Sequence, residues 1–237
     1  TKNNLKVFLL PKQGYHKTYV TLSTNFGSNH DSFILNGRKY KIPLGSAHFL
    51  EHKLFEKAGM DVSYQFALQS AQVNAYTQNN QTTYLFSCTE NLKDNIQLLT
   101  DFVFHPEFTE KGIKKEIGII TEEIKMYEDD PSSVSYLGIL NNMYFNHPIT
   151  HNILGSEATI NQINKPTLEK IHQAFYKPDN MMMFIAGNFD ILDMKSFISN
   201  LSIQSTDIDS DTDIIYKEEP KKAQFKSKSV EKDVMIP

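Results

Sequence analysis

The sequence predicts an α+β fold in which an antiparallel-rich mixed sheet is packed by helices. Short β-prone runs separated by turn residues indicate the strands, and longer segments with apolar residues every three or four positions indicate the helices. Of the 237 residues, 40% are hydrophobic, which is enough to form a buried core. We therefore expect one α+β domain over residues 1–202.

The expected strands form two hairpins and one later strand. Residues 5–10 and 18–26 are β-prone and are joined by Pro11-Lys12-Gln13-Gly14, a pattern that predicts a first hairpin. A polar, mixed stretch follows. The turn at residues 78–81 predicts a second hairpin, in which residues 73–76 pair with residues 82–86. The remaining strand is expected at residues 181–185.

Helices are predicted where apolar residues recur at helical spacing behind a capping residue or a proline. The expected helices cover residues 47–55, 61–69, 92–103, 109–129, 131–145, 166–175 and 190–201. Beyond them, residues 203–229 have the polar composition of a linker. An unfinished apolar segment at residues 230–237 is interpreted as the start of a truncated second domain.

The composition argues against several classes of partner. The formal net charge is −4, so there is no electrostatic footprint for nucleic acid or an anionic membrane. No apolar run reaches the ~18 residues that span a bilayer, and a cytoplasmic protein is expected. The single cysteine, Cys88, lies in an apolar run and is expected in the core.

Three residues of the first predicted helix suggest metal chemistry. His48 and His52 are four residues apart, so both imidazoles lie on one helix face, about one turn from each other, and can bind one metal ion. Zinc is inferred from the ligand type. Glu51 can take a proton from the attacking water without binding the metal. The order is the inverted H-x-x-E-H motif.

A catalytic zinc has three protein ligands and one open position, so another element has to supply a ligand. In the helix predicted at residues 109–129, Glu116 and Glu123 are two turns apart and face the same way. Either could reach the metal, whereas Glu122 points about 100° away. By spacing alone, a metal site and a solvated helix face have about even odds.

Both segments resemble the pitrilysin family of zinc peptidases, which includes insulin-degrading enzymes and mitochondrial processing peptidases. Residues 45–52 resemble the family's zinc helix, and residues 116–123 resemble its helix with two glutamates seven positions apart. The resemblance implies that Glu123 is the third zinc ligand. It also implies that Glu116 supports the catalytic site without binding the metal.

The resemblance extends to a strand that would bind substrate. Asn74, Ala75, Tyr76 and Thr77 resemble the family's edge strand, to which a peptide is added as a further antiparallel strand. Without the zinc helix, an ordinary edge strand would be the better interpretation. Residues 70–72 read Ser-Ala-Gln where the family often has a glycine pair.

The resemblance covers residues 5–202. Among the family's members, the chain most resembles bacterial cytoplasmic proteins of about twice this length. Family members are usually built of two homologous halves, and the second supplies an arginine and a tyrosine that hold the substrate. The resemblance therefore implies a C-terminal homologous half or a partner subunit.

These observations predict a zinc-dependent peptidase that hydrolyses peptide bonds. The alternative is a non-catalytic subunit or inactive half-domain that grips a peptide or a partner; such subunits typically lack part of the motif, whereas all four positions are present here. A purely structural zinc site is disfavoured, because those sites are usually closed by four ligands rich in cysteine.

Overall fold

The computed structural model describes residues 4–57, 59–201, 203 and 210–211. Its main sheet has five strands in the order β1-β9-β2-β8-β7, and only the β1·β9 pair is parallel. The strands are β1 (Lys6–Pro11), β9 (Met181–Gly187), β2 (Thr18–Thr24), β8 (Thr82–Cys88) and β7 (Ala71–Thr77). The predicted antiparallel-rich mixed sheet is confirmed.

Two smaller sheets accompany the main one. β3 (Ser32–Leu35) lies between β4 (Arg38–Lys41) and β10 (Ser210–Asp211), and β5 (Glu56–Lys57) pairs with β6 (Met60–Asp61). The helices are α1 (Ser46–Leu54), α2 (Ser63–Leu68), α3 (Leu92–Phe104), α4 (Glu110–Glu128), α5 (Pro131–Met143), α6 (Glu157–Ile160), α7 (Lys165–Phe175) and α8 (Ile191–Asn200), with the 3-10 turns η1 (Pro148–Thr150) and η2 (Pro178–Asn180).

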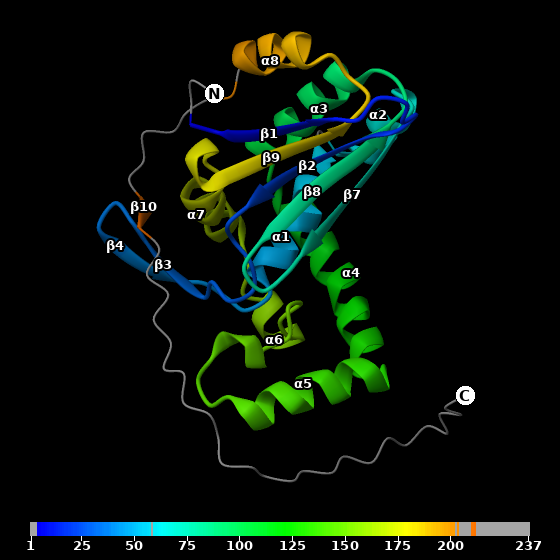
Figure 1. The fold of residues 1–237 in the computed structure, drawn as a ribbon. Helices are drawn as coiled ribbons and strands as arrows, with labels where there is room; N and C mark the ends of the chain where they lie inside the picture. The colour runs from blue at the N-terminus through cyan, green and yellow to red at the C-terminus, as the bar shows by residue number, and fades with distance from the viewer. Residues whose placement is uncertain (1–3, 58, 202, 204–209, 212–237) are drawn as a thin grey trace, which may run out of the picture.

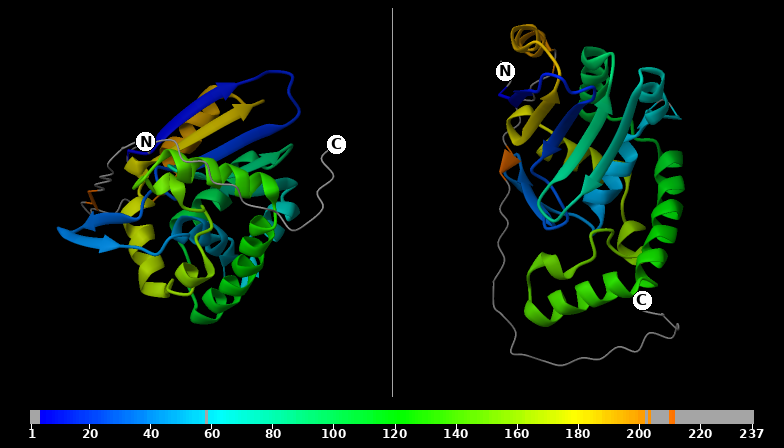
Figure 2. Two further views of the ribbon diagram at one scale, coloured as in Figure 1. Left: turned by 90° about the horizontal axis from the view of Figure 1, so that it is seen from below. Right: turned by 45° about the vertical axis from the view of Figure 1, so that its right-hand side comes forward.

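Helices α1, α3 and α7 lie behind the main sheet in Figure 1, and the core fills the space between these layers. Alternate side chains of the central strands, such as Val20, Phe86 and Ile185, are fully buried against this helical layer. From the sheet, α4 descends to α5, which crosses below it (Figures 1 and 2). Because α4 packs beside α1, the H-x-x-E-H motif of α1 lies next to the two glutamates of α4.

The predicted first hairpin is wrong. β1 and β2 do reverse direction around residues 12–17, but β9 lies between them and pairs with both. β9 is apolar on both faces, with Met183 and Ile185 fully buried, whereas β1 has no buried residue. Burial therefore favours β9 in the interior and β1 at the edge, although the local turn signal is correct.

Most other predicted elements are confirmed. β7 and β8 form the second hairpin, and each predicted helix is present with its ends shifted by a few residues. The side chain of Thr109 accepts a hydrogen bond from the Gly112 amide and caps α4, as expected. Cys88 is buried, as expected.

The β3–β4 hairpin lies within residues 27–41, the stretch that the sequence analysis describes only as polar and mixed. Its turn is Asn36-Gly37, with φ values of 51° and 73°. This dipeptide between apolar and β-prone residues is a strong hairpin signal, so the sequence did contain the information.

Most of residues 203–237 lies outside the described part of the chain. Within the predicted linker, Ile203 is buried and Ser210–Asp211 pairs with β3. The predicted second domain at 230–237 lies outside the described residues. Across the described ranges, no helix has both the length and the apolar character needed to cross a bilayer.

Candidate active site

The helix with the inverted motif begins at a glycine that its surroundings require. Gly45, at the N-terminus of α1, has φ 88°, and a Cβ there would lie 2.3 Å from the Leu154 carbonyl oxygen. Gly155 has the reciprocal restriction, since its Cβ would lie 2.4 Å from the Leu44 carbonyl oxygen. Two glycines thus let the segment before α6 contact the start of α1 through main-chain atoms.

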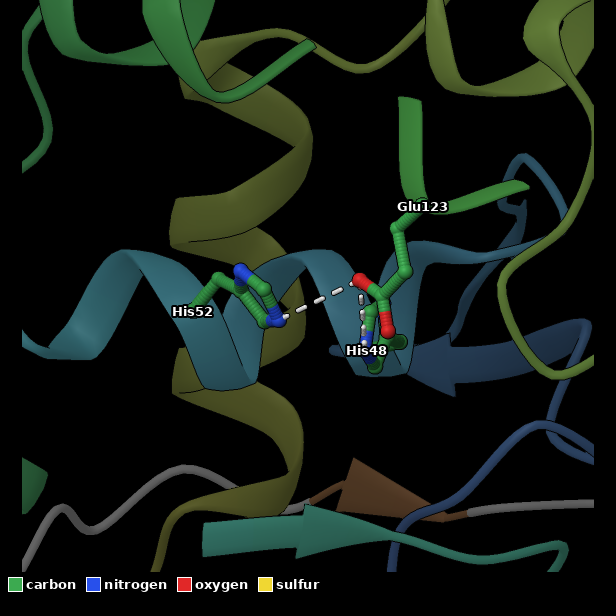
Figure 3. Close-up of side chains that lie close together, drawn as sticks. All are labelled: His48, His52 and Glu123. Atoms are coloured by element: carbon green, nitrogen blue, oxygen red, sulfur yellow. Dashed lines mark ion pairs between the residues drawn. The ribbon is translucent and has the colours of Figure 1, made fainter. Parts of the chain in front are cut away.

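Three potential metal ligands converge between α1 and α4. The Nε2 atoms of His48 and His52 lie 3.7 and 3.8 Å from the Oε2 atom of Glu123. One donor atom from each side chain falls within a common span of 4.8 Å. Figure 3 shows Glu123 reaching from α4 toward both rings, which project from one face of α1.

This donor set fits zinc. Two ligands of a tetrahedral zinc ion at about 2.0–2.1 Å are about 3.4 Å apart, close to the separations between Glu123 and the two histidines. Two imidazoles and one carboxylate are also the ligand types of catalytic zinc sites, which leave a fourth position open. The cluster therefore needs only small side-chain adjustments to bind the ion.

Glu116 contacts one of the histidines from the side away from Glu123. Its Oε1 atom lies 2.9 Å from Nδ1 of His52, while Nε2 of the same ring faces Glu123. A carboxylate bonded to the far nitrogen of a metal-binding imidazole fixes the tautomer and the ring orientation. Glu116 and Glu123 thus contact the site differently although they share one face of α4.

Burial shapes the electrostatics of the cluster. It lowers the pKa of His48 to about 3, with His52 adding to the shift, so the ring is neutral as metal binding requires. Burial lowers the pKa of His52, but the hydrogen bond to Glu116 and attraction by Glu116, Glu51 and Glu123 together raise it above its usual value. Burial also raises the pKa values of Glu51 and Glu123, partly opposed by neighbours.

Glu51 does not belong to the donor cluster but is held beside it. It is 7% exposed, and its Oε2 atom accepts a hydrogen bond of 2.6 Å from the hydroxyl of Thr77. Thr77 belongs to β7, so this bond connects α1 directly to the edge of the sheet.

β7 is the edge strand of the main sheet within the described residues. The Gln78 amide donates to the Gln81 carbonyl across the turn, so the main-chain groups of Asn74 and Tyr76 face β8. Those of Ala75 and Thr77 therefore point away from the sheet. The side-chain oxygen of Asn74 accepts a hydrogen bond of 2.8 Å from the outward Ala75 amide.

Two cavities adjoin the cluster and this edge. One, of about 510 Å³, extends from the two histidines to apolar residues of α5 and the following loop, including Tyr136, Leu140 and Ile153. The other, of about 820 Å³, lies beside the first turns of α4. Both are lined by Glu51, His52, Asn74 and Ala75, so both open spaces reach the edge strand and the candidate catalytic groups.

All the site residues expected from the sequence are thus brought together. No sequence pattern indicates the buried hydroxyl pair near them, in which the Tyr84 and Tyr176 oxygens lie 2.8 Å apart. Burial first, and the neighbouring ionisable groups second, hold the pKa of Tyr84 above its usual range. The hydrogen bond between Thr77 and Glu51 could also not be predicted without the tertiary fold, because it joins β7 to α1.

The chain belongs to the insulinase family, peptidase family M16. The model of this family matches residues 7–157, more than half of the chain. The match includes α1, α4 and β7, the three elements that contribute the site described above.

Similar proteins are known from bacteria. "Uncharacterized zinc protease YmfH" of Bacillus subtilis is 46% identical over 190 residues, which cover 79% of this chain and 44% of that protein. An M16-like peptidase from Alicyclobacillus acidocaldarius has a TM-score of 0.84 at 36% identity, covering 89% of this chain and 51% of that one. The chain therefore spans about half the length of these relatives.

A more distant structure shares the fold alone. This inactive M16 peptidase domain from Pseudomonas fluorescens has a TM-score of 0.74 at 18% identity, and the similarity covers 85% of this chain and 48% of that one. The same fold therefore occurs in an inactive domain as well.

Proposed function

We propose that this chain carries the metal-binding catalytic site of a zinc-dependent peptidase, with His48, His52 and Glu123 as ligands. The observation that carries the proposal is the convergence of these donors beside an exposed sheet edge. A metal cluster alone would fit many reactions. A free strand edge next to it favours an extended peptide as the substrate.

The residues around the cluster have distinct tasks. When bound, zinc supplies Lewis acidity that makes a water molecule more acidic and polarises a peptide carbonyl. Glu51 accepts the proton of the attacking water and delivers it to the departing amine. Glu116 keeps the His52 ring in the orientation that presents Nε2 to the cluster.

The outward main-chain groups of β7 bind the substrate. A peptide added antiparallel to β7 donates to and accepts from Ala75 and Thr77, whatever its own side chains. The Asn74 side chain already occupies the Ala75 amide, so a peptide carbonyl takes over that hydrogen bond and releases the Asn74 carboxamide. Exchange of one hydrogen bond for another leaves no buried donor unpaired.

A second unit completes the site in this proposal. The chain spans 44% of the Bacillus subtilis relative and 51% of the Alicyclobacillus acidocaldarius chain, and its two cavities are open. A further homologous half or a partner subunit would close over the peptide. The isolated chain then cleaves slowly, because orientation and charge stabilisation are incomplete.

Peptide hydrolysis by the isolated chain tests the proposal. The chain, at micromolar concentration, is incubated for hours with a mixture of unstructured peptides, and the products are identified by mass spectrometry. We expect slow cleavage that a chelator abolishes and that added zinc restores. If the zinc-loaded chain releases no product but still binds the peptides, the non-catalytic alternative is correct.

A further inference from the structure

Thr77 has two sides with different surroundings. It lies opposite Thr82 in a pair without main-chain hydrogen bonds, because Gln78 and Gln81 form the adjacent bonded pair. Its main chain therefore faces the free edge of the sheet. Its side chain points to the helical side, where the hydroxyl meets Glu51.

The donor of the Thr77–Glu51 hydrogen bond can be assigned by counting hydroxyl protons. Thr82 donates its proton to the Phe26 carbonyl oxygen at 2.9 Å, so its oxygen is only an acceptor toward Thr77. Thr77 has a single proton and two acceptors within reach, Glu51 at 2.6 Å and Thr82 at 3.4 Å. The shorter contact, to a carboxylate, receives it.

The bond acts on one oxygen of the carboxylate. Thr77 contacts Oε2 of Glu51, and no other hydrogen bond to this side chain is present among the described residues. The other oxygen, Oε1, is left for the reacting water. Without the threonine hydroxyl, the carboxylate can turn about its terminal torsion, which has only a broad preference of its own.

We propose that Thr77 is a positioning residue that holds the Glu51 carboxylate in register with the peptide bound on β7. One residue would then fix both reaction partners, since its main chain pairs with the substrate and its hydroxyl fixes the general base. The inference rests on the proposed peptidase function and adds to it. A hydroxyl already donated to Glu51 is not a substrate contact, so Thr77 binds substrate through its main chain alone.

Two substitutions separate the hydroxyl from the shape of the side chain. Thr77→Val keeps the branched side chain and the strand but removes the hydroxyl. We expect kcat to fall about 10- to 100-fold, because a misplacement of about 1 Å has costs of this order. KM should change less than about twofold, since the main-chain pairing remains. Thr77→Ser should retain kcat within about threefold of the parent.

Thr21→Val is the matched control. Thr21 lies in β2 of the same sheet, opposite Leu85 of β8. Its side chain is on the face of the sheet that points away from the helices, as the alternating burial of β2 shows. This variant should leave kcat, KM and zinc content at the parent values. A loss caused only by valine in the sheet would appear in this control as well.

A double-mutant cycle tests the hydrogen bond without any activity measurement. The stability lost in Thr77→Val is measured by urea denaturation in the parent and in Glu51→Ala. We expect the loss to be at least halved when Glu51 is absent, because contacting residues are not additive.

The outcomes distinguish the inference from the proposed function. A parent that cleaves peptides, with kcat unchanged in Thr77→Val, would overturn the positioning role alone. Equal stability losses in the two backgrounds would overturn the hydrogen bond on which it depends. A zinc-loaded parent that never cleaves would overturn the proposed function and the inference together.

Discussion

His52 lies between two glutamates of α4, with Nδ1 2.9 Å from Glu116 and Nε2 3.8 Å from Glu123. In the proposed site the ring therefore gives the two carboxylates different roles, because Nδ1 donates its proton to Glu116 and Nε2 faces the candidate metal position. His48 contacts Glu123 but not Glu116. Glu123 is thus the carboxylate shared by both histidines, which the spacing of seven residues alone could not decide.

The two glutamates should differ in their effect on zinc affinity. Glu116→Ala should weaken zinc binding about 10- to 100-fold, the usual effect of losing a residue that orients a ligand. Glu123→Ala should weaken it more, because a ligand is removed. Isothermal titration with a competing chelator measures both affinities. Equal losses, or a larger loss in Glu116→Ala, would contradict the assignment of Glu123 as the ligand.

Glu51→Gln should separate metal binding from catalysis. The side chain keeps its size but loses the basic carboxylate, so cleavage should fall about 10²- to 10⁴-fold while one zinc per chain remains. Elemental analysis and peptide hydrolysis are measured on the same preparation. Cleavage near the parent rate would show that another group acts as the base.

Gly45 should be essential for folding of the site. Gly45→Ala places a Cβ 2.3 Å from the Leu154 carbonyl oxygen at a positive φ, so we expect a loss of more than about 1 kcal/mol in the free energy of unfolding. Gly138→Ala is the matched control. Gly138 is exposed within α5 with no atom near its Cβ, and alanine should stabilise that helix by about 0.5–1 kcal/mol.

Chemical denaturation of both glycine variants checks this prediction. A Gly45→Ala variant as stable as the parent would mean that the contact between the loop before α6 and the start of α1 relaxes without cost. The pair of variants excludes a general effect of replacing glycine by alanine, since the two changes are expected to have opposite signs.

Cys88 should be almost inert in the folded chain. Burial raises the pKa of its thiol to about 11, so only about one molecule in a thousand carries the thiolate at pH 8. Labelling with a thiol-specific reagent should be slow in the native protein and fast in denaturant. Since this is the only cysteine, the signal is unambiguous. Rapid labelling of one thiol per native chain would contradict its burial.

The helices and the pairing of His48 with His52 could be predicted from the sequence, because both depend on local spacing. Spacing left Glu116 and Glu123 both open as ligands, and the choice of Glu123 and of the edge strand at residues 74–77 came from the resemblance to the family. The apolar positions of α4 and its cap at Thr109 define one face of the helix, and the glutamates follow from that face. The order of strands depends instead on contacts between distant segments. Nothing near Lys6–Pro11 in the sequence indicates that Met181–Gly187 will pair with it.

The contacts in the site also fall into those that local spacing determines and those that tertiary packing determines. His48 and His52 are on one face by helical geometry alone. The hydrogen bond from Thr77 to Glu51 spans 26 positions, and the contact of Gly45 with Leu154 spans many more. These relationships arise from packing of β7 and the loop before α6 against α1, which no local pattern specifies.

The zinc content of the purified chain shows whether His48 and His52 hold a metal ion. Elemental analysis is made on the parent and on His48→Ala/His52→Ala after both are supplied with zinc and dialysed. We expect about one zinc per parent chain and none in the double variant. Absence of zinc from the parent, or an equal content in both proteins, would contradict the assignment of these histidines as metal ligands.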